Sequence, residues 1–161
     1  MADADARSAA DMEIRRATAA DAELLRSWRN DPEARRMFRN PGSVDHDSHM
    51  AWLRKTLMDD STLLLVGVVD REPVGSIRFD RQPDDLAVVN ISIAGQHRGR
   101  GLGRQLLDLG CRHAEETDFA RVFRADIRTD NATSHRLFRS LGFVLTSHAD
   151  GWDMYLRGPT A

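Results

Sequence analysis

The stretch Gln96-His-Arg-Gly-Arg-Gly-Leu-Gly-Arg-Gln-Leu-Leu107 is the most informative part of this chain. It follows an apolar run, Leu86–Ile93, that predicts a strand, and it leads into leucines at helical spacing. Glycines let a backbone approach a ligand closely, and the first turn of a helix leaves amide donors unpaired and carries partial positive charge. A glycine-marked turn between a strand and a helix therefore predicts a cradle for a diphosphate.

The distribution of acidic residues supports this prediction. The two longest stretches without Asp or Glu are 86–107 and 131–149, in a chain that has 25 acidic residues. They contain basic side chains instead: Arg98, Arg100 and Arg104 in the first stretch, and His135, Arg136 and Arg139 in the second. Two turns kept clear of negative charge are expected where a polyanionic ligand binds.

Other interpretations of the glycine-rich stretch fit less well. It could be a bare loop with solvated arginines, but the strand, the spaced glycines, the helix and the missing acids together favour the cradle. A dinucleotide-binding motif requires Gly where Arg104 stands, and the sequence has no Gly-Lys-Ser/Thr triplet of a P-loop.

The composition restricts the class of protein. A length of 161 residues fits one domain that can bury a core without disulfides or metals. The net charge of −2 argues against nucleic acid as a partner, and no apolar run is long enough to cross a membrane. Residues 1–11 lack the features of a signal peptide, so we expect a disordered terminus there, a domain over 12–158 and a cytoplasmic protein.

Cysteine and lysine each occur once in this chain. Cys111 is the only cysteine, and its place in an amphipathic helix indicates a packed residue rather than a nucleophile. Lys55 is the only lysine among 23 basic residues, so the presence of any one arginine carries little information.

The predicted elements indicate an α/β (α+β) fold with a mixed central sheet flanked by helices. Their order is β-α-α-β-β-β-α-β-α-β-β, with an extra short helix that begins at Pro32. The predicted strands are Met12–Arg16, Ser61–Val69, Val74–Phe79, Leu86–Ile93, Arg121–Arg128, Phe143–Ser147 and Trp152–Leu156. The predicted helices follow a capping box at Thr18, a cap at Ser43, the glycines at 99–103 and Asn131.

Two segments together resemble the GNAT acyl-CoA N-acetyltransferases. Arg98-Gly-Arg-Gly-Leu-Gly103 matches the R/Q-x-x-G-x-G/A signature of that family, and Asn131-Ala-Thr-Ser-His-Arg-Leu-Phe-Arg-Ser-Leu-Gly-Phe143 resembles its second conserved segment. The resemblance is strong over 85–157 and weaker before. It implies a single GNAT-like domain, acetyl-CoA as co-substrate, no metal, and acetyl transfer to a primary amine by direct attack in a ternary complex.

The resemblance also implies which residues hold the coenzyme. Amides of 99–104 would bind the diphosphate, and the strand near Ile91 and Ile93 would splay from Ile127 to leave a gap for the pantetheine arm. An amide near Ile93 would polarise the thioester carbonyl. The expected cofactor residues are Ile91, Ile93, Arg98, Gly99, Arg100, Gly101, Leu102, Gly103, Arg104, Asn131, Ser134 and Phe138.

The acid–base residues are less well defined, because Phe138 stands where many relatives have a Tyr that is thought to protonate the thiolate. Ser134 and Tyr155 are the candidates for that donor, since Phe has no proton to give. Asp126, His49 or a water chain are the candidates for the base that takes a proton from the amine.

The first third of the chain loosely resembles acetyltransferases of ribosomal-protein amino termini and of amino-sugar nucleotides. This likeness implies that Trp28, His49 and Trp52 line the acceptor side of the cleft, although Trp28 also continues an apolar helix stripe. His46 and His49 have no evident third metal ligand, and homodimers are common among relatives. The alternatives are an acyl-CoA-binding regulatory domain without transferase activity, which Phe138 favours, and a nucleic-acid-binding domain that uses the arginines of 98–104.

Overall fold

The computed structural model describes residues 11–159, so the disordered terminus expected at 1–11 lies, apart from Asp11, outside the described residues. Seven strands form one sheet in the order β1-β2-β3-β4-β5-β7-β6. The strands are β1 (Glu13–Arg16), β2 (Thr62–Val69), β3 (Glu72–Gln82), β4 (Leu86–Ile93), β5 (Val122–Arg128), β6 (Val144–Ala149) and β7 (Trp152–Arg157). Neighbours are antiparallel except for β4 and β5, which are parallel, so the predicted mixed sheet is confirmed.

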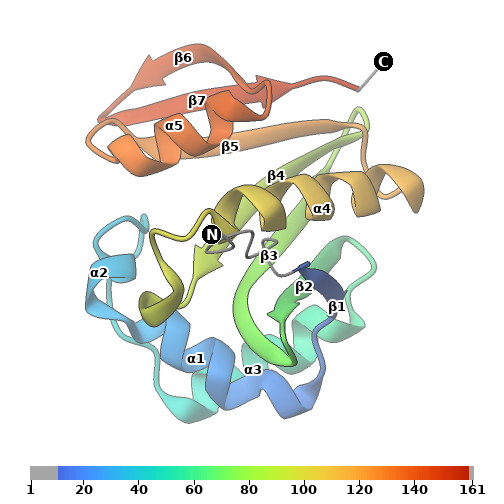
Figure 1. Cartoon of the computed structure of the whole chain (residues 1–161), viewed down its shortest axis with the longest axis vertical. Coiled ribbons are helices and arrows are strands. Elements are labelled where there is room, and N and C mark those ends of the chain that lie inside the picture. The colour runs from blue at the N-terminus through green and yellow to red at the C-terminus, as the bar shows by residue number, and fades with distance from the viewer. Residues whose placement is uncertain (1–10, 160–161) are drawn as a thin grey trace, which may run out of the picture.

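Helices cover both faces of this sheet. The α-helices are α1 (Ala22–Asn30), α2 (Pro32–Arg35), α3 (His46–Met58), α4 (Leu102–Glu116) and α5 (Ala132–Ser140), and short 3-10 turns span Ala19–Asp21 and Gly95–His97. Figure 1 shows α1 and α3 at the β1–β3 end of the molecule, and α5 beside β5, β7 and β6 at the other end. The element order is the predicted one, with α2 as the extra short helix at Pro32.

The side chains of β2 point alternately to the two faces of the sheet, and this explains why there are two hydrophobic cores. Leu63 and Leu65 belong to a cluster with residues of α4 and α5, whereas Leu64 and Val66 belong to a second cluster with Leu25, Trp28 and Leu53 of α1 and α3. Because successive side chains of a strand point to opposite faces, α4 and α5 lie on one face of the sheet and α1 and α3 on the other.

The sheet opens between β4 and β5. Their parallel pairing is confined to Leu86–Val88 against Val122–Arg124, although both strands continue for several residues. Beyond Val88 the remaining residues of β4 pair with no strand of the described chain on the β5 side. A gap therefore opens in the sheet beside the C-terminal half of β4, which is the end of the strand from which the chain continues to α4.

Local signals account for most element ends, and one expected cap is wrong. Gly99 and Gly101 have positive φ values of 76° and 75°, which residues other than glycine rarely adopt, and they turn the chain into α4. Asn131 caps α5 by accepting a hydrogen bond from the Ser134 amide, at 3.2 Å. The cap of α3 is Asp45, not Ser43, because the Asp45 carboxylate reaches the Ser48 amide at 2.7 Å.

Candidate active site

Two cavities meet at the open end of β4. A cavity of about 520 Å³ extends from the β4 edge over the glycine turn to α5, and we call it the cofactor cavity. A second of about 580 Å³ extends from β4 towards α1 and α3, and we call it the acceptor cavity. Both are lined by Ile91 and Ser92 of β4 and by Met37 and Phe38 after α2. The two cavities therefore adjoin at these four residues.

The glycine turn presents unobstructed main-chain donors to the cofactor cavity. Gly101 is the N-cap of α4 and provides no side-chain cap, so the first amides of the helix have no partner from that residue. A Cβ atom added at Gly99 or Gly101 would meet nothing within 4 Å, so the space beside the turn is open. Free amides at the positive end of a helix dipole fit an anionic group such as a diphosphate.

The edge of β4 offers a second set of main-chain groups. The Ala94 amide donates to the Val74 carbonyl of β3, at 2.8 Å. Because alternate amides of a strand point to opposite sides, those of Ile91 and Ile93 point into the gap that β5 leaves. An extended chain such as a pantetheine arm can pair with these groups by strand addition.

Most of the expected cofactor residues line this cavity. They are Ile91, Ile93, Arg98, Gly99, Gly101, Leu102, Gly103, Arg104, Asn131 and Ser134. Arg100 and Phe138 are not among the lining residues. Arg100 folds back so that its Nη1 lies 3.0 Å from His97 Nδ1. Phe138 is buried in the core, where it packs edge-on against Phe143 because it lies on the apolar face of α5.

Arg98 joins the glycine turn to α2. Its guanidinium donates to Asp31 and to Glu33, each at 3.0 Å. Glu33 also lines the cofactor cavity. The stretch 86–107 contains no acidic residue, but the fold brings Asp31 and Glu33 to Arg98. Arg98 therefore links the glycine turn to α2 and also lines the cofactor cavity.

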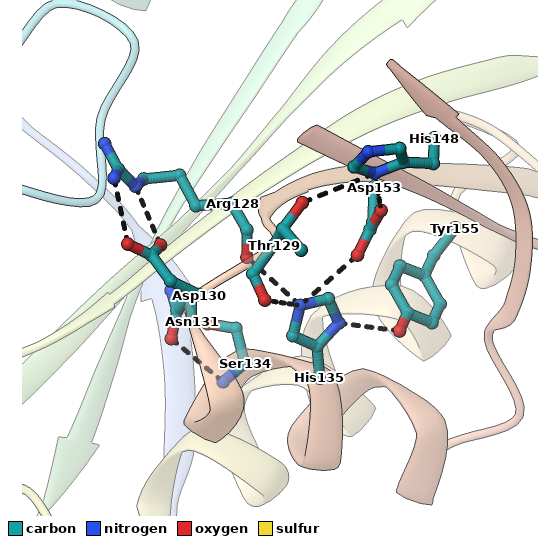
Figure 2. Close-up of polar contacts among 9 residues, drawn as sticks. All are labelled: Arg128, Thr129, Asp130, Asn131, Ser134, His135, His148, Asp153 and Tyr155. Atoms are coloured by element: carbon teal, nitrogen blue, oxygen red, sulfur yellow. Dashed lines mark hydrogen bonds and ion pairs between the residues drawn. The ribbon is translucent and has the colours of Figure 1, made fainter. Parts of the chain in front are cut away.

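A partly buried hydrogen-bond network joins the start of α5 to β5 and β7 (Figure 2). His135 Nε2 lies 3.0 Å from the Arg128 carbonyl and 3.2 Å from the Thr129 carbonyl at the end of β5, and its Nδ1 lies 2.6 Å from the Tyr155 hydroxyl. Because carbonyls only accept, Nε2 carries a hydrogen and donates to them, while Nδ1 and the Tyr155 hydroxyl are hydrogen-bonded to each other. Asp153 lies 3.6 Å from His135 and bonds His148 at 2.5 Å.

Figure 2 also separates the two candidate proton donors. The Tyr155 side chain is fully buried, its hydroxyl is engaged by His135, and it lines neither cavity. Ser134 lines the cofactor cavity, and its hydroxyl has no hydrogen-bond partner among residues 11–159. The structure thus places Ser134 at the cavity and Tyr155 behind it.

The acceptor cavity brings together the other expected residues. Trp28, His49, Trp52 and Asp126 all line it. Trp28 is also part of the second core, and the rings of His49 and Trp52 lie 5.3 Å apart. The Asp126 carboxylate accepts from Arg124 at 3.1 and 2.9 Å, so both of its oxygens are occupied.

His49 differs from Asp126 in being unpaired. Its Nδ1 is buried without a hydrogen-bond partner among the described residues. Burial lowers the pKa of His49, and the nearby Arg26 acts in the same direction. The imidazole is therefore neutral at pH 7 and able to accept a proton.

The sequence interpretation missed the arginines of the acceptor cavity. Arg29, Arg39 and Arg78 line it, although they come from α1, from the segment after α2 and from β3. Their separation along the chain left no motif. In a sequence whose basic residues are almost all arginine, only the fold singles these three out.

The described residues also have features that bear on thiol, metal and membrane chemistry: Cys111 is buried in the core. Burial raises the pKa of the Cys111 thiol to about 12, as expected for a packed residue. Within residues 11–159, no cluster of three or more His, Cys, Asp or Glu side chains is arranged to hold a metal ion. None of the helices in the described part of the chain has the length and apolar character needed to span a membrane.

Comparisons with known proteins agree with this architecture. The model of the acetyltransferase (GNAT) domain family matches residues 11–144. A putative acetyltransferase, yncA, from Salmonella typhimurium, solved with its cofactor acetyl-CoA, is 26% identical, with a TM-score of 0.76 over 91% of this chain and 93% of its own. A ribosomal-protein-alanine N-acetyltransferase from Brucella melitensis is 26% identical, with a TM-score of 0.77 over 91% of this chain and 99% of its own.

A more distant structure shares the fold alone. The spermidine N-acetyltransferase from Vibrio cholerae, in complex with CoA and spermine, is 16% identical, with a TM-score of 0.80 over 90% of this chain and 92% of its own. Among curated proteins, no sequence match is found.

The sheet, its helices and the paired cavities define a single α/β domain with two adjoining cavities, and the family match is more specific. This chain belongs to the GNAT family of acetyltransferases. The predictions of a single GNAT-like domain and of an acetyl-CoA-dependent N-acetyltransferase are thereby confirmed.

Proposed function

We propose that this protein transfers an acetyl group from acetyl-CoA to a primary amine by direct attack within a ternary complex. The observation that carries the proposal is the shared boundary of the two cavities at Ile91 and Ser92. Acetyl-CoA would supply the activated thioester carbonyl there. Holding both reactants across that boundary contributes about 7–11 kcal/mol through positioning when the geometry is good.

The residues that would hold the coenzyme follow from the cofactor cavity. The amides of the glycine turn and the start of α4 would bind the diphosphate, and the amides of Ile91 and Ile93 would face the pantetheine arm. The unpaired Ile93 amide is also the proposed donor to the carbonyl oxygen. Arg104 would add positive charge beside the same cavity.

Two side chains are the proposed proton carriers. The Ser134 hydroxyl would donate to the departing thiolate, because it faces the cofactor cavity and has no other partner among the described residues. The His49 imidazole would accept the proton of the amine, because its burial keeps it neutral. Asp126 is the weaker candidate, since Arg124 occupies its carboxylate.

The acceptor is proposed to be a protein amino terminus or an amino-sugar nucleotide. The Brucella melitensis relative, named for ribosomal-protein alanine, supports a protein acceptor. The Vibrio cholerae protein of the same fold is in complex with CoA and spermine, a small amine. A homodimer and a cytoplasmic location stay predictions.

Initial-rate kinetics with free-thiol detection test the proposal. We expect thiol release that depends on both acetyl-CoA and an amine, with intersecting double-reciprocal lines as in a ternary complex. Parallel lines would indicate an acetyl-enzyme instead. Tight coenzyme binding without transfer to any amine would support the alternative of a regulatory binding domain, which Phe138 keeps open.

A further inference from the structure

The charged side chains that line the acceptor cavity are mostly cationic. Arg29, Arg39 and Arg78 contribute three guanidinium groups. Asp126 is the one carboxylate among the described lining residues, and it is paired with Arg124 outside this set. The cavity therefore has positive charge that its own wall does not neutralise.

Arg29 is the most constrained of the three. Its Nη2 donates to the Asn40 carbonyl at 2.6 Å, and its guanidinium lies 4.5 Å from the centre of the Phe38 ring. Its Nη1 is buried and has no hydrogen-bond partner in the described chain. Burial lowers the pKa of Arg29, and the charges of Arg35 and Arg78 act in the same direction. A buried donor of a charged group without a partner is costly, and an anion would remove that cost.

The other two guanidiniums are held by aromatic rings. Arg39 lies 4.1 Å from the centre of the Trp152 ring and has no carboxylate partner within residues 11–159. Arg78 lies 5.7 Å from the centre of the Trp52 ring, and its Nε forms a hydrogen-bonded ion pair with Asp80, at 3.1 Å, which leaves its two Nη groups without that partner. Stacking fixes the plane of a guanidinium and leaves its edge donors available for a bidentate contact.

We propose that the amine acceptor carries a carboxylate or phosphoryl group, which Arg29, Arg39 and Arg78 bind while its amine faces β4. This inference rests on the proposed N-acetyltransferase function and narrows its acceptor to small anionic amines, which favours the amino-sugar nucleotide over the protein amino terminus. A cavity of about 580 Å³ is of the size that proteins use for small ligands. A polyamine would instead bring further positive charge to three guanidiniums, which is unfavourable.

Matched acceptors test the charge requirement. The probes are γ-aminobutyrate, n-butylamine and putrescine for the carboxylate arm, and phosphoethanolamine against ethanolamine for the phosphoryl arm. We expect kcat/KM for the anionic member of each set to exceed that of the others by at least about tenfold, the effect of one charge-assisted hydrogen bond. The arm with the larger ratio identifies which anionic group the cavity takes.

Variants assign this preference to the arginines. Arg39→Gln and Arg78→Gln should each raise the KM for the anionic amine at least about tenfold, with KM for acetyl-CoA unchanged. Arg29→Lys keeps the charge but loses the fork of donors, and should show a similar rise if its circular dichroism matches the wild type. Arg54→Gln is the control, since Arg54 is exposed on α3 and lines neither cavity.

The outcomes separate this inference from the proposed function. Transfer to neutral or cationic amines as efficiently as to their anionic counterparts would overturn the inference and leave the acetyltransferase proposal standing. An anionic preference that survives all three arginine substitutions would also overturn it. Failure to acetylate any amine while coenzyme binds would overturn the proposed function, and the inference with it.

Discussion

Ser134 is the proposed proton donor to the leaving group, since it lines the cofactor cavity and its hydroxyl has no partner among the described residues. We predict that Ser134→Ala lowers kcat by at least about tenfold, because proton donation by a positioned group accelerates such steps by 10²–10⁴. The KM for acetyl-CoA should change little. Ser147→Ala, an exposed change on β6 outside both cavities, is the control. A kcat for Ser134→Ala equal to that of the control would remove Ser134 from the mechanism.

His49 gives a prediction in the pH profile. Burial lowers its pKa below the ordinary value of about 6.5, so the ring accepts protons throughout the neutral range and loses this ability only at lower pH. We predict that kcat/KM for the amine has an acidic limb below about pH 6.5, and that His49→Gln is slower at neutral pH and lacks that limb. His46→Gln, exposed on the same helix, should retain it. If the acidic limb persists in His49→Gln, a group other than His49 is the general base.

Asp21 gives a stability prediction. Its carboxylate accepts two hydrogen bonds from Arg15 and one from the Thr18 amide, each at 2.8 Å. The Arg15 hydrogen bonds lower the pKa of Asp21, so its stabilisation is complete above the unfolded value of about 3.9 and is lost as the pH falls through the lower folded value. Asp21→Asn should lower the free energy of unfolding by about 1–3 kcal/mol at pH 7.

Urea titration at several pH values checks the Asp21 prediction. The difference between wild type and Asp21→Asn should shrink as the pH falls below about 4, because the wild-type carboxylate then becomes protonated. A difference that stays constant through that range would show that the charge of Asp21 is not the source of its effect.

Among the elements, α5 depends on a contact that sequence alone does not show. Tyr155 of β7 bonds His135 of α5, and His135 in turn bonds the end of β5. Tyr155→Phe leaves His135 Nδ1 unsatisfied, and we predict a loss of about 1–3 kcal/mol in the free energy of unfolding. Because Tyr155 lines neither cavity, kcat should stay within about twofold of wild type, as for a residue that makes no transition-state contact. A large loss of kcat with normal stability would restore Tyr155 as the proton donor.

The sequence allowed the elements around the glycine turn to be predicted because their signals are local. Leu86–Ile93 was predicted to the residue as β4, and Asn131 correctly marked the start of α5. Contacts between distant segments were not accessible in this way. The pairing of Arg98 with Asp31 and Glu33 joins residues 65 and 67 positions apart, and Phe138 was assigned to the cofactor although its helix face packs into the core.

In the whole molecule, both cavities lie where β4 separates from β5 after Val88. The cofactor cavity uses segments that are close in sequence, which is why ten of its expected residues could be named in advance. The acceptor cavity gathers α1, the segment after α2, α3, β3 and β4, and its arginines share no motif. The lining of the cofactor cavity could thus be predicted largely from the sequence, whereas the arginines of the acceptor cavity are brought together only by the fold.

The central claim is that main-chain donors of the glycine turn hold the coenzyme diphosphate, and calorimetric titration of coenzyme A into two matched variants tests it. Gly101→Ala and Gly151→Ala each place a methyl group at a positive φ, at 75° and 79°, and each should cost about 1–2 kcal/mol of stability. Only Gly101 lines the cofactor cavity. We predict micromolar or tighter binding by wild type and Gly151→Ala, and at least about tenfold weaker binding by Gly101→Ala. Absence of heat with the wild-type protein, or equal affinities for the two variants, would contradict the account.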